Sequence, residues 1–365
     1  MQTNMTSGAQ PQPAAAIDPG RLEALMGLMV NELGAAQNAA LVILGDELGL
    51  YDALAKGGPM TSQELADATG THERYVREWL SAQAASGYVS YDPATALFHL
   101  SPEQAAVLAD PDSPVNMAGG FLALVSTFAD RPKLTEAFRT GAGVCWTEHC
   151  NCLFCGTDRF FRPGYKSHLL QEWLPALDGV VDKLERGARV ADIGCGFGSS
   201  TLIMAEAFPN SQFVGYDFHQ GSIDAARAKA EAGGLPNVRF EVARAQDYAG
   251  ADFDLVTLFD ALHDMGDPVG AARHIARSLA PGGKVMLVEP MAGDALEDNL
   301  HPVGRIFYAA STNFCVPASL GQEVGAALGA QAGQKRLEAV LREGGLTKVR
   351  RAATTPFNMV LEAGV

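Results

Sequence analysis

One stretch of this chain constrains its fold more than any other, because an apolar run there breaks into three alternating glycines. Residues 190–193 have the composition of a buried strand, Gly194, Gly196 and Gly198 follow, and Ser199 opens a segment of helical character. Glycine adopts positive φ and has no Cβ, so the backbone comes close to a ligand. The pattern predicts a strand, a loop that cradles a nucleotide, and a helix whose amides face that ligand.

An acidic residue downstream supports the nucleotide interpretation. Nucleotide-binding units of this kind place a carboxylate about 20 positions on, at the end of the second strand, where it binds ribose hydroxyls. Asp217 stands there, directly after the apolar run 213–216. The glycine spacing departs from the dinucleotide fingerprint G-x-G-x-x-G, because position 199 is serine and the third glycine comes one residue early.

Further strands and helices follow at regular intervals. Buried strands are predicted over 238–242, 253–260 and 284–290, with a helix over about 268–280 that ends at Pro281-Gly282-Gly283. A last helix is predicted over 334–343, before two short strand-like runs at 347–353 and 357–361. Alternation of strands and helices predicts an α/β fold.

As an ordered set over about 186–365, these motifs resemble the class I S-adenosylmethionine (SAM)-dependent methyltransferases. The resemblance rests on the G-x-G-x-G loop, Asp217, the Phe-Asp-Leu-Val strand from 253 and the Pro-Gly-Gly-Lys turn from 281. It implies a Rossmann-like sheet of seven strands with helices on both faces. It also implies a final antiparallel strand inserted beside its predecessor, and SAM as the cofactor.

The resemblance assigns cofactor contacts to particular residues. The three glycines would approach the methionyl part of SAM, and Asp217 would accept hydrogen bonds from both ribose hydroxyls. Asp192 either orients the amino group or caps the loop. Phe218 is a candidate for the adenine face, and Ala245 and Gln246 are candidates for the adenine edge. Asp260, at the end of the strand over 253–260, is a further candidate contact. Arg162 and Tyr165 are candidates for the methionyl carboxylate, with a surface salt bridge as the alternative for Arg162.

A histidine base is expected if the methyl acceptor is a hydroxyl, because that hydroxyl must lose a proton. His263 is the candidate, since it follows a strand at the sheet edge where ligands bind in open α/β folds. Asp264 or Glu289 would hold its imidazole in one tautomer. Alternatively, His263 only caps the next helix or borders the cofactor. His149, beside Glu148, is a second candidate acid/base group.

Charge and composition exclude several classes of protein. The 365 residues carry 27 basic and 42 acidic side chains, a net charge of −15, which repels nucleic acid. We see no apolar run near the ~18 residues that cross a bilayer. Residues 1–20 lack the pattern of a signal peptide. We therefore expect a cytoplasmic enzyme with no membrane partner.

The first part of the chain predicts a separate helical domain over 21–110, after a disordered tail at 1–20. An amphipathic stripe begins at Leu22, and 39–54 is apolar on most faces, as at a subunit interface. A capping box at Thr61, a helix over 73–86 and strands near 87–91 and 97–100 describe a winged helix. Glutamates beside Arg74 and Arg77 leave no positive face for DNA. We therefore favour a homodimerisation domain over a DNA-binding one.

Residues 111–185 are expected to form a helical connector or lid that carries a cysteine-rich loop. Cys145, Cys150, Cys152 and Cys155 lie there, but only the last two have C-x-x-C spacing, so no metal is assigned. They either fill the loop as small side chains, bind a soft ion such as arsenite, or sense oxidation. After them, an amphipathic helix is predicted to start past Tyr165 and run through Leu177.

Together these features predict a SAM-dependent methyltransferase that acts on a small molecule at oxygen, nitrogen, carbon or sulfur. The acceptor would bind beneath an insertion at 291–332, which is rich in aromatic and polar side chains. Three alternatives stay open: a thiol, sulfide or arsenite methyltransferase that uses the cysteine-rich loop, a SAM-binding winged-helix regulator, and a non-catalytic subunit of a dimeric partner.

Overall fold

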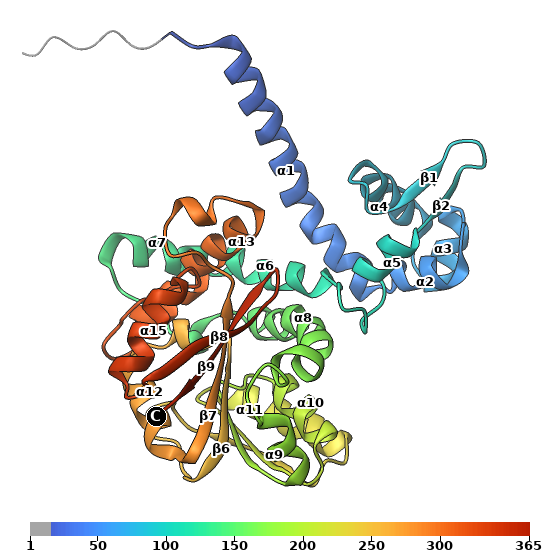
Figure 1. The fold of residues 1–365 in the computed structure, drawn as a ribbon. Coiled ribbons are helices and arrows are strands. Elements are labelled where there is room, and N and C mark those ends of the chain that lie inside the picture. The colour runs from blue at the N-terminus through green and yellow to red at the C-terminus, as the bar shows by residue number, and fades with distance from the viewer. Residues whose placement is uncertain (1–15) are drawn as a thin grey trace, which may run out of the picture. The chain divides into compact units, whose positions relative to one another are not determined.

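The computed structural model describes residues 16–365, and the chain divides into two compact units after Ser101 (Figure 1). We call them the N-terminal unit and the C-terminal unit, Pro102–Val365. Most of the tail expected at 1–20 lies outside the described residues, and Pro19 and Gly20 already belong to the first helix.

The N-terminal unit contains the expected helix-turn-helix and wing. Thr61 and Glu64 form the predicted capping box at the start of α3, and the two short strands pair antiparallel. Its elements are α1 (Pro19–Glu47), α2 (Leu50–Gly57), α3 (Ser62–Thr69), α4 (Glu73–Ala85), β1 (Ser90–Asp92) and β2 (Leu97–His99).

The helix α4 carries its arginines in ion pairs along its own surface. Arg77 contacts Glu73 at 2.6 Å, and Arg74 contacts Glu78 at 2.6 Å. Both pairs have the i, i+4 spacing that brings side chains together on a helix. The helix α4 occupies the position of the DNA-recognition helix in a winged helix. Glutamates therefore neutralise the two arginines of this helix.

The first helix, α1, keeps much of its apolar surface in solvent. Leu25, Met26, Val30 and Leu33 are each 55–65% exposed. By length and composition alone, α1 is the one helix of the described chain that could cross a membrane, with a mean hydropathy of 1.2 over 18 residues, of which 17% are buried. The sequence showed no uninterrupted apolar run of that length, because a window average tolerates interruptions such as Asn31.

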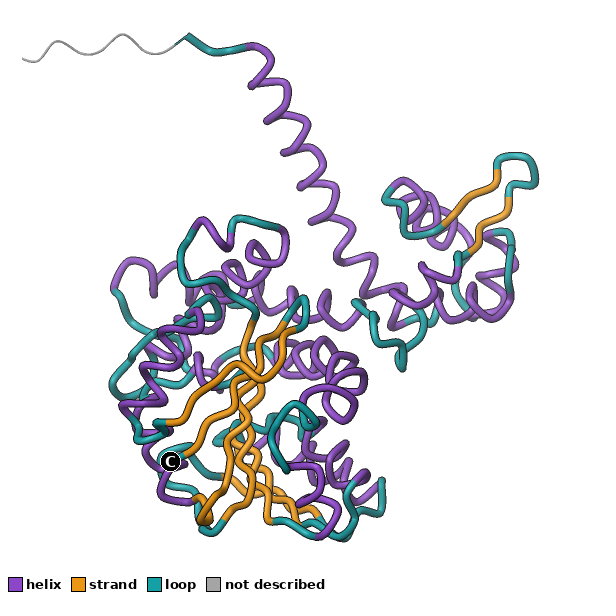
Figure 2. The backbone as a smooth tube through the Cα atoms, in the orientation of Figure 1, coloured by secondary structure: helices purple, strands orange, loops and turns teal. Residues whose placement is uncertain are grey.

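A seven-stranded sheet forms the centre of the C-terminal unit, with the strand order β5-β4-β3-β6-β7-β9-β8 (Figure 2). Neighbours from β5 to β7 pair in parallel, whereas β9 is antiparallel to both β7 and β8. This is the inserted last strand that the resemblance implied. The strands are β3 (Arg189–Ile193), β4 (Gln212–Asp217), β5 (Val238–Val242), β6 (Phe253–Phe259), β7 (Leu279–Pro290), β8 (Lys348–Thr354) and β9 (Asn358–Gly364).

Alternate strand residues face two different cores, as the period of a β-strand requires. Val285 and Leu287 of β7 pack toward α12 (Pro268–Ser278) and α15 (Gly333–Glu343). Met286 and Val288 pack on the opposite face, toward α9 (Val180–Arg186) and α10 (Ser199–Ala207). The helix α11 (Gln220–Ala232) covers β4 and β5. Helices thus cover both faces of the sheet (Figure 1).

The connector differs from the prediction, because Cys152, Cys155 and Tyr165 lie on one long helix, α8 (Asn151–His168), with Cys150 as its N-cap, instead of in a loop before a helix. The helix was predicted to start only past Tyr165, yet Pro163 and Tyr165 both lie inside α8. A Cβ on Gly156 would lie 2.4 Å from the Ala123 amide, so α6 (Ala118–Ala129) packs tightly against α8. This packing holds the helix across its proline, where local sequence rules expect a break.

Short helices complete the C-terminal unit on either side of this core. The expected insertion at 291–332 folds mainly as helix, with a π-helical turn at its centre. These elements are α5 (Pro102–Leu108), α7 (Arg131–Thr140), η1 (Trp146–Glu148), η2 (Leu169–Trp173), η3 (Leu262–Asp264), η4 (Glu297–Asn299), α13 (Pro302–Ala310), η5 (Ser311–Cys315) and α14 (Val316–Leu320).

Candidate functional site

The glycine loop follows β3, at the point where the strand order reverses. Gly194, Gly196 and Gly198 all have positive φ, between 51° and 75°. A Cβ on Gly194 would lie 2.7 Å from Ala261, and one on Gly198 would lie 2.6 Å from the Phe240 ring. A Cβ on Gly196 would meet no protein atom within 4 Å. Two of the glycines therefore permit close packing, and Gly196 faces open space where a ligand can approach.

Asp217 ends β4 and orders this loop. One carboxylate oxygen accepts from the Gly196 amide at 3.0 Å, and the other accepts from the His219 amide at 2.8 Å. Burial raises the pKa of Asp217, and these two amides oppose that rise. Each oxygen keeps a second lone pair for a ligand hydroxyl. The structure thus places Asp217 against the glycine loop, as the sequence predicted.

Asp192 lies in β3 and is buried, with its side chain on the α10 side of the sheet. It accepts hydrogen bonds from Ser200 at 2.8 Å, Thr201 at 2.6 Å and Thr257 at 3.0 Å. Burial raises its pKa to about 6, and the three hydroxyls oppose this. Asp192 therefore ties β3 to the start of α10 and to β6, which fixes the direction of the loop.

The residues expected at the adenine lie on two loops beside Asp217. Phe218 is 42% exposed, directly after β4. Ala245 packs against the edge of the core after β5. Gln246 donates to the backbone carbonyl of Asp267 at 3.2 Å, so its side-chain amide holds the loop that precedes α12.

Asp260, after β6, is strained and incompletely bonded. Its φ is +49°, a conformation that non-glycine residues rarely adopt. One carboxylate oxygen accepts from the Asn358 amide at 2.8 Å, whereas Oδ2 is buried without a partner among the described residues. Burial, and then the charge of Glu289, raise its pKa well above the usual range. The sheet edge thus holds a buried acceptor with no donor.

Arg162 and Tyr165 reach this edge from α8. The Arg162 guanidinium lies 3.8 Å from Asp158, and its Nε is buried without a partner among the described residues. Tyr165 is buried, and its pKa is raised well above the usual value by burial and by the charges of Asp260 and Asp192. The helix thus brings a free donor and a phenol to the same edge as the unpaired Asp260 oxygen.

Asp158, which was not predicted from the sequence, fixes α8 over the loop. It accepts from Ser199, the first residue of α10, at 2.5 Å, and from Lys229 of α11 at 2.9 Å. No motif marks Asp158, because its partners lie 41 and 71 positions away.

His263 lies in η3 and is 3% exposed. Its Nδ1 lies 2.5 Å from Oε2 of Glu289, at the end of β7, whose other oxygen accepts from the Leu262 amide at 3.0 Å. Burial alone lowers the pKa of His263, but the charges of Asp264 and Glu289 outweigh it and raise that pKa well above 6.5. With Nδ1 donating to Glu289, Nε2 is the nitrogen that exchanges a proton.

Asp264 and Cys315 lie around Nε2 of His263. The Asp264 carboxylate is 3.2 Å from Nε2, an ion-pair contact without hydrogen-bond geometry. Ligand atoms of His263, Asp264 and Cys315 all lie within 4.8 Å of one another. Burial, and then the Asp264 charge, raise the pKa of Cys315 to about 12, so this thiol stays protonated. Both Glu289 and Asp264 contact His263, at different ring nitrogens.

His149 is a second buried imidazole held by a carboxylate. Its Nδ1 lies 2.8 Å from Asp130, rather than near the adjacent Glu148, and its Nε2 is buried without a partner among the described residues. Its ring meets Phe314 edge to face at 5.7 Å, and the next residue, Cys315, lies beside His263 and Asp264. His149 therefore borders the His263 site. Asp130 was missed, because nothing in the sequence pairs it with His149.

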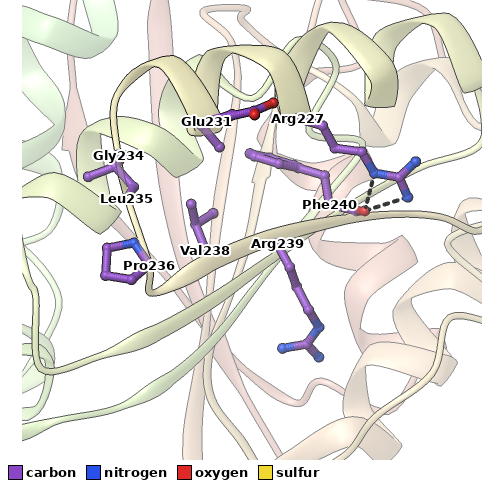
Figure 3. Close-up of a pocket in the computed structure, with 9 residues that line it drawn as sticks. Arg227, Glu231, Gly234, Leu235, Pro236, Val238, Arg239 and Phe240 are labelled. Carbon is purple, nitrogen blue, oxygen red and sulfur yellow. Dashed lines mark hydrogen bonds between the residues drawn. The ribbon is translucent and has the colours of Figure 1, made fainter.

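A separate pocket of about 390 Å³ lies at the outer edge strand, β5 (Figure 3). Arg227 of α11 points across it and donates twice to the Phe240 carbonyl, at 3.0 and 2.8 Å. Leu235 and Pro236 line it just before β5 begins. Ligands of open α/β sheets bind at the carboxyl ends of the strands instead. The candidate site is therefore the edge that holds Asp217, Asp260 and His263.

Comparison with protein families identifies both parts of the chain. A "Methyltransferase domain" model matches residues 184–345, and an "Rv2258c-like winged HTH domain" model matches residues 36–110. The chain combines a winged helix-turn-helix domain with a class I methyltransferase domain. The methyltransferase domain contains the glycine loop, Asp217, His263 and Glu289.

Individual relatives match either part of this chain in sequence or most of it in structure. The demethylmenaquinone methyltransferase of Thermus thermophilus is 34% identical over 116 residues, which are 31% of this chain and 51% of the relative. The chain thus spans about half the length of the curated relatives it matches. A putative O-methyltransferase from Nostoc punctiforme has a TM-score of 0.67 at 20% identity, over 96% of this chain and 99% of that one. Human N-acetylserotonin methyltransferase, solved in complex with SAM, gives 0.68 at 16% identity, over 97% and 100%.

The raised pKa of Asp192 predicts a pH-dependent stability. A carboxyl with a folded pKa of about 6 contributes stability below pH 4 that is lost as the pH rises through 6. Relative to Asp192→Asn, which does not titrate, the wild type should lose up to about 3 kcal/mol of unfolding free energy between pH 4 and pH 7. Denaturant titrations at several pH values measure this. The exposed Asp224→Asn serves as control, and parallel curves for wild type and Asp192→Asn would contradict the assignment.

Proposed function

We propose that this protein transfers a methyl group from SAM to a hydroxyl group of a small molecule, with His263 as general base. The observation that carries the proposal is the buried His263–Glu289 pair, with Nδ1 and Oε2 2.5 Å apart. It lies at the same sheet edge as the glycine loop and Asp217. A nucleotide-cradling loop and an oriented base at one edge are what hydroxyl methylation requires.

The residues at the loop fit SAM. Gly196 leaves room for close approach, and Asp217 has lone pairs for ribose hydroxyls. The amino acid part of SAM carries an ammonium and a carboxylate, which match the unpaired Asp260 Oδ2 and Arg162 Nε. When bound, SAM supplies a methyl group on a positively charged sulfur. This sulfur is the leaving group, and its charge makes further activation unnecessary.

His263 would remove the acceptor proton at Nε2. Glu289 fixes the ring through Nδ1 and stabilises the imidazolium that forms, because a buried anion beside a cation lowers the energy of the charged pair. Alignment supplies most of the rate, since oriented reactants are worth effective molarities of about 10⁵–10⁸ M. His149, whose free Nε2 borders the site, would hydrogen-bond a second polar group of the acceptor.

The relatives support oxygen as the acceptor atom over the alternatives. The Nostoc punctiforme neighbour is described as a putative O-methyltransferase, and a ubiquinone biosynthesis O-methyltransferase is 34% identical over 118 residues. The paired arginines of α4 argue against a DNA-binding regulator. The glycine loop and the His263–Glu289 pair argue against a non-catalytic subunit, because both are complete.

The protein would be a cytoplasmic homodimer that associates through its N-terminal unit. The exposed apolar side chains of α1 support dimerisation, because contiguous exposed apolar side chains mark interaction sites. All six cysteines are free, which suits a reducing compartment.

Gly196→Ala should weaken cofactor binding without unfolding the protein. Its Cβ would meet no protein atom, so the cost to the fold is the roughly 1 kcal/mol of an alanine at positive φ. Affinity for S-adenosylhomocysteine should fall at least tenfold, about 1.4 kcal/mol. Calorimetry measures this. Gly282→Ala is the matched control, because Gly282 also has positive φ and open space but lies in the turn within β7. Equal affinities in both variants would exclude the loop as the site.

The base assignment predicts a rate that rises with pH. Because the pKa of His263 is raised well above 6.5, kcat should climb with pH to a midpoint above that value, on a phenolic acceptor found by screening. His263→Asn should lower kcat by about 10²–10⁴ while S-adenosylhomocysteine still binds. Glu289→Gln removes one of the charges that raise this pKa, so the midpoint of kcat against pH should lie at lower pH in this variant. An unchanged kcat in His263→Asn would refute the role.

Dimerisation through α1 predicts a mass of twice 38.5 kDa for the full chain in light scattering. Leu25→Asp together with Met29→Asp should give a folded monomer, because both side chains are about half exposed in the single chain. Leu300→Asp, at an exposed leucine of the C-terminal unit, should remain dimeric. A monomeric wild type would refute dimerisation, and a dimeric double variant would place the interface elsewhere.

A further inference from the structure

Two cysteines at the start of α8 have their sulfurs in contact. Sγ of Cys150 lies 3.0 Å from Sγ of Cys152. Cys150 is the N-cap of the helix, and Cys152 lies in its first turn. The Sγ of the nearby Cys145 instead donates to the Gly321 carbonyl at 3.4 Å. The proposed methyl transfer uses none of these thiols, so the contact between Cys150 and Cys152 needs an explanation of its own.

The two sulfurs differ in their surroundings. The backbone amide of Cys152 points at Sγ of Cys150, 3.5 Å away, so the first turn of α8 directs positive charge at that sulfur. A helix N-terminus favours the thiolate, which is the form that oxidants attack. Cys152 is the opposite case, because its hydrogen bond with Cys150, and then burial, raise the pKa of its thiol to about 11. The pair thus combines a sulfur that is stabilised as an anion with a thiol that keeps its proton.

Both thiols are accessible to small molecules and lie close to bonding distance. Cys150 and Cys152 are partly exposed, whereas Cys195 and Cys315 are buried. A disulfide bond is about 2.05 Å long, so the two sulfurs have to approach by roughly 1 Å. Exposed disulfides are the labile and regulatory ones, because reductants reach them. The geometry therefore suits a bond that forms and breaks in the folded protein.

We propose that Cys150 and Cys152 form a reversible disulfide when a hydroperoxide oxidises them, and that this bond shifts the Asp130–His149 pair beside the candidate site. In a reducing compartment such disulfides are transient and sense oxidation. The proposal does not depend on the methyl transfer, because it concerns thiols and an oxidant only.

The oxidation proceeds in two steps. The Cys150 thiolate attacks one oxygen of the peroxide and the O–O bond breaks, which makes Cys150 a sulfenic acid. The other oxygen takes up a proton and leaves as water or an alcohol. The Cys152 sulfur then attacks the sulfenic sulfur and loses its proton, and the sulfenic hydroxyl leaves as water. Two thiols are thereby oxidised by two electrons, and the peroxide is reduced.

The backbone of Cys150 is connected to His149 through one buried carboxylate. The Cys150 amide donates to Oδ2 of Asp130 at 3.3 Å, and the same oxygen lies 2.8 Å from Nδ1 of His149. The other oxygen of Asp130 accepts from Lys133 at 3.0 Å. Closing the disulfide moves Cys150 relative to this carboxylate, so it changes the hydrogen bond that holds the imidazole. Oxidation is therefore detectable at His149 without any methyl transfer.

Hydrogen peroxide applied to the reduced full-length protein tests the proposal. All six cysteines are free, so iodoacetamide should label six thiols in the denatured reduced protein and four after oxidation. The intact mass before labelling should fall by two hydrogen atoms, and dithiothreitol should restore both values. Peroxide that only adds oxygen to the protein, or that links two chains instead of forming an internal bond, would overturn the proposal.

The cysteine variants decide which thiols pair. Cys150→Ser and Cys152→Ser should show no loss of two hydrogen atoms after the same treatment. The neighbouring Cys145→Ser and the exposed Cys155→Ser are matched controls, and both should lose two hydrogen atoms as the wild type does. An internal disulfide that still forms in Cys152→Ser would assign the bond to another pair and overturn the proposal.

NMR of the imidazole groups tests the connection to the site. The His149 resonance, assigned by its absence in His149→Gln, should shift when the wild type is oxidised and should stay in place in Cys152→Ser. An unshifted resonance once the disulfide has formed would refute the effect on Asp130 and His149. None of these measurements uses SAM, so failure here stays distinct from failure of the proposed methyl transfer.

Discussion

Buried negative charge at one sheet edge is the constraint on which the rest of the methyltransferase domain depends. Asp192, Asp217, Asp260, Asp264 and Glu289 are all at or near the carboxyl ends of β3, β4, β6 and β7. Burial raises the pKa of the four aspartates, since a carboxylate away from water is costly. Hydroxyls, backbone amides, the Asn358 amide and one imidazole each compensate part of this cost. A ligand that brings positive charge would compensate the rest of this cost.

The parts of the site that the sequence predicted are those whose partners are close along the chain or fixed by a repeating fold. The strand–glycine–helix unit is local, so the loop over 194–198 was predicted with its positive φ values. Parallel strands align their carboxyl ends, so Asp217, His263 and Glu289 were expected at one edge although 72 positions separate the first from the last. The seven-stranded sheet with its antiparallel insertion followed from the resemblance.

The parts that were not predicted depend on contacts between distant segments. Asp130 holds His149, Asp158 fixes α8 onto α10 and α11, and Asn358 supports Asp260 across 98 positions. None of these side chains belongs to a motif. A helix was expected to start past Tyr165, whereas α8 already begins at Asn151, and tight packing of Gly156 against α6 holds it across Pro163. Tertiary contacts decided each case.

The π-helical turn η5 explains how two distant imidazoles come to border one site. It presents Phe314 to the His149 ring at 5.7 Å, and the next residue, Cys315, lies within 4.8 Å of the ligand atoms of His263 and Asp264. A π-helix has more residues per turn than an α-helix, so consecutive side chains diverge by a smaller angle and can face the same site, and such turns are frequent at functional sites. Both rings are held at Nδ1 by buried carboxylates from other elements. The insertion therefore shapes the acceptor side of the site, whereas the sheet edge shapes its cofactor side.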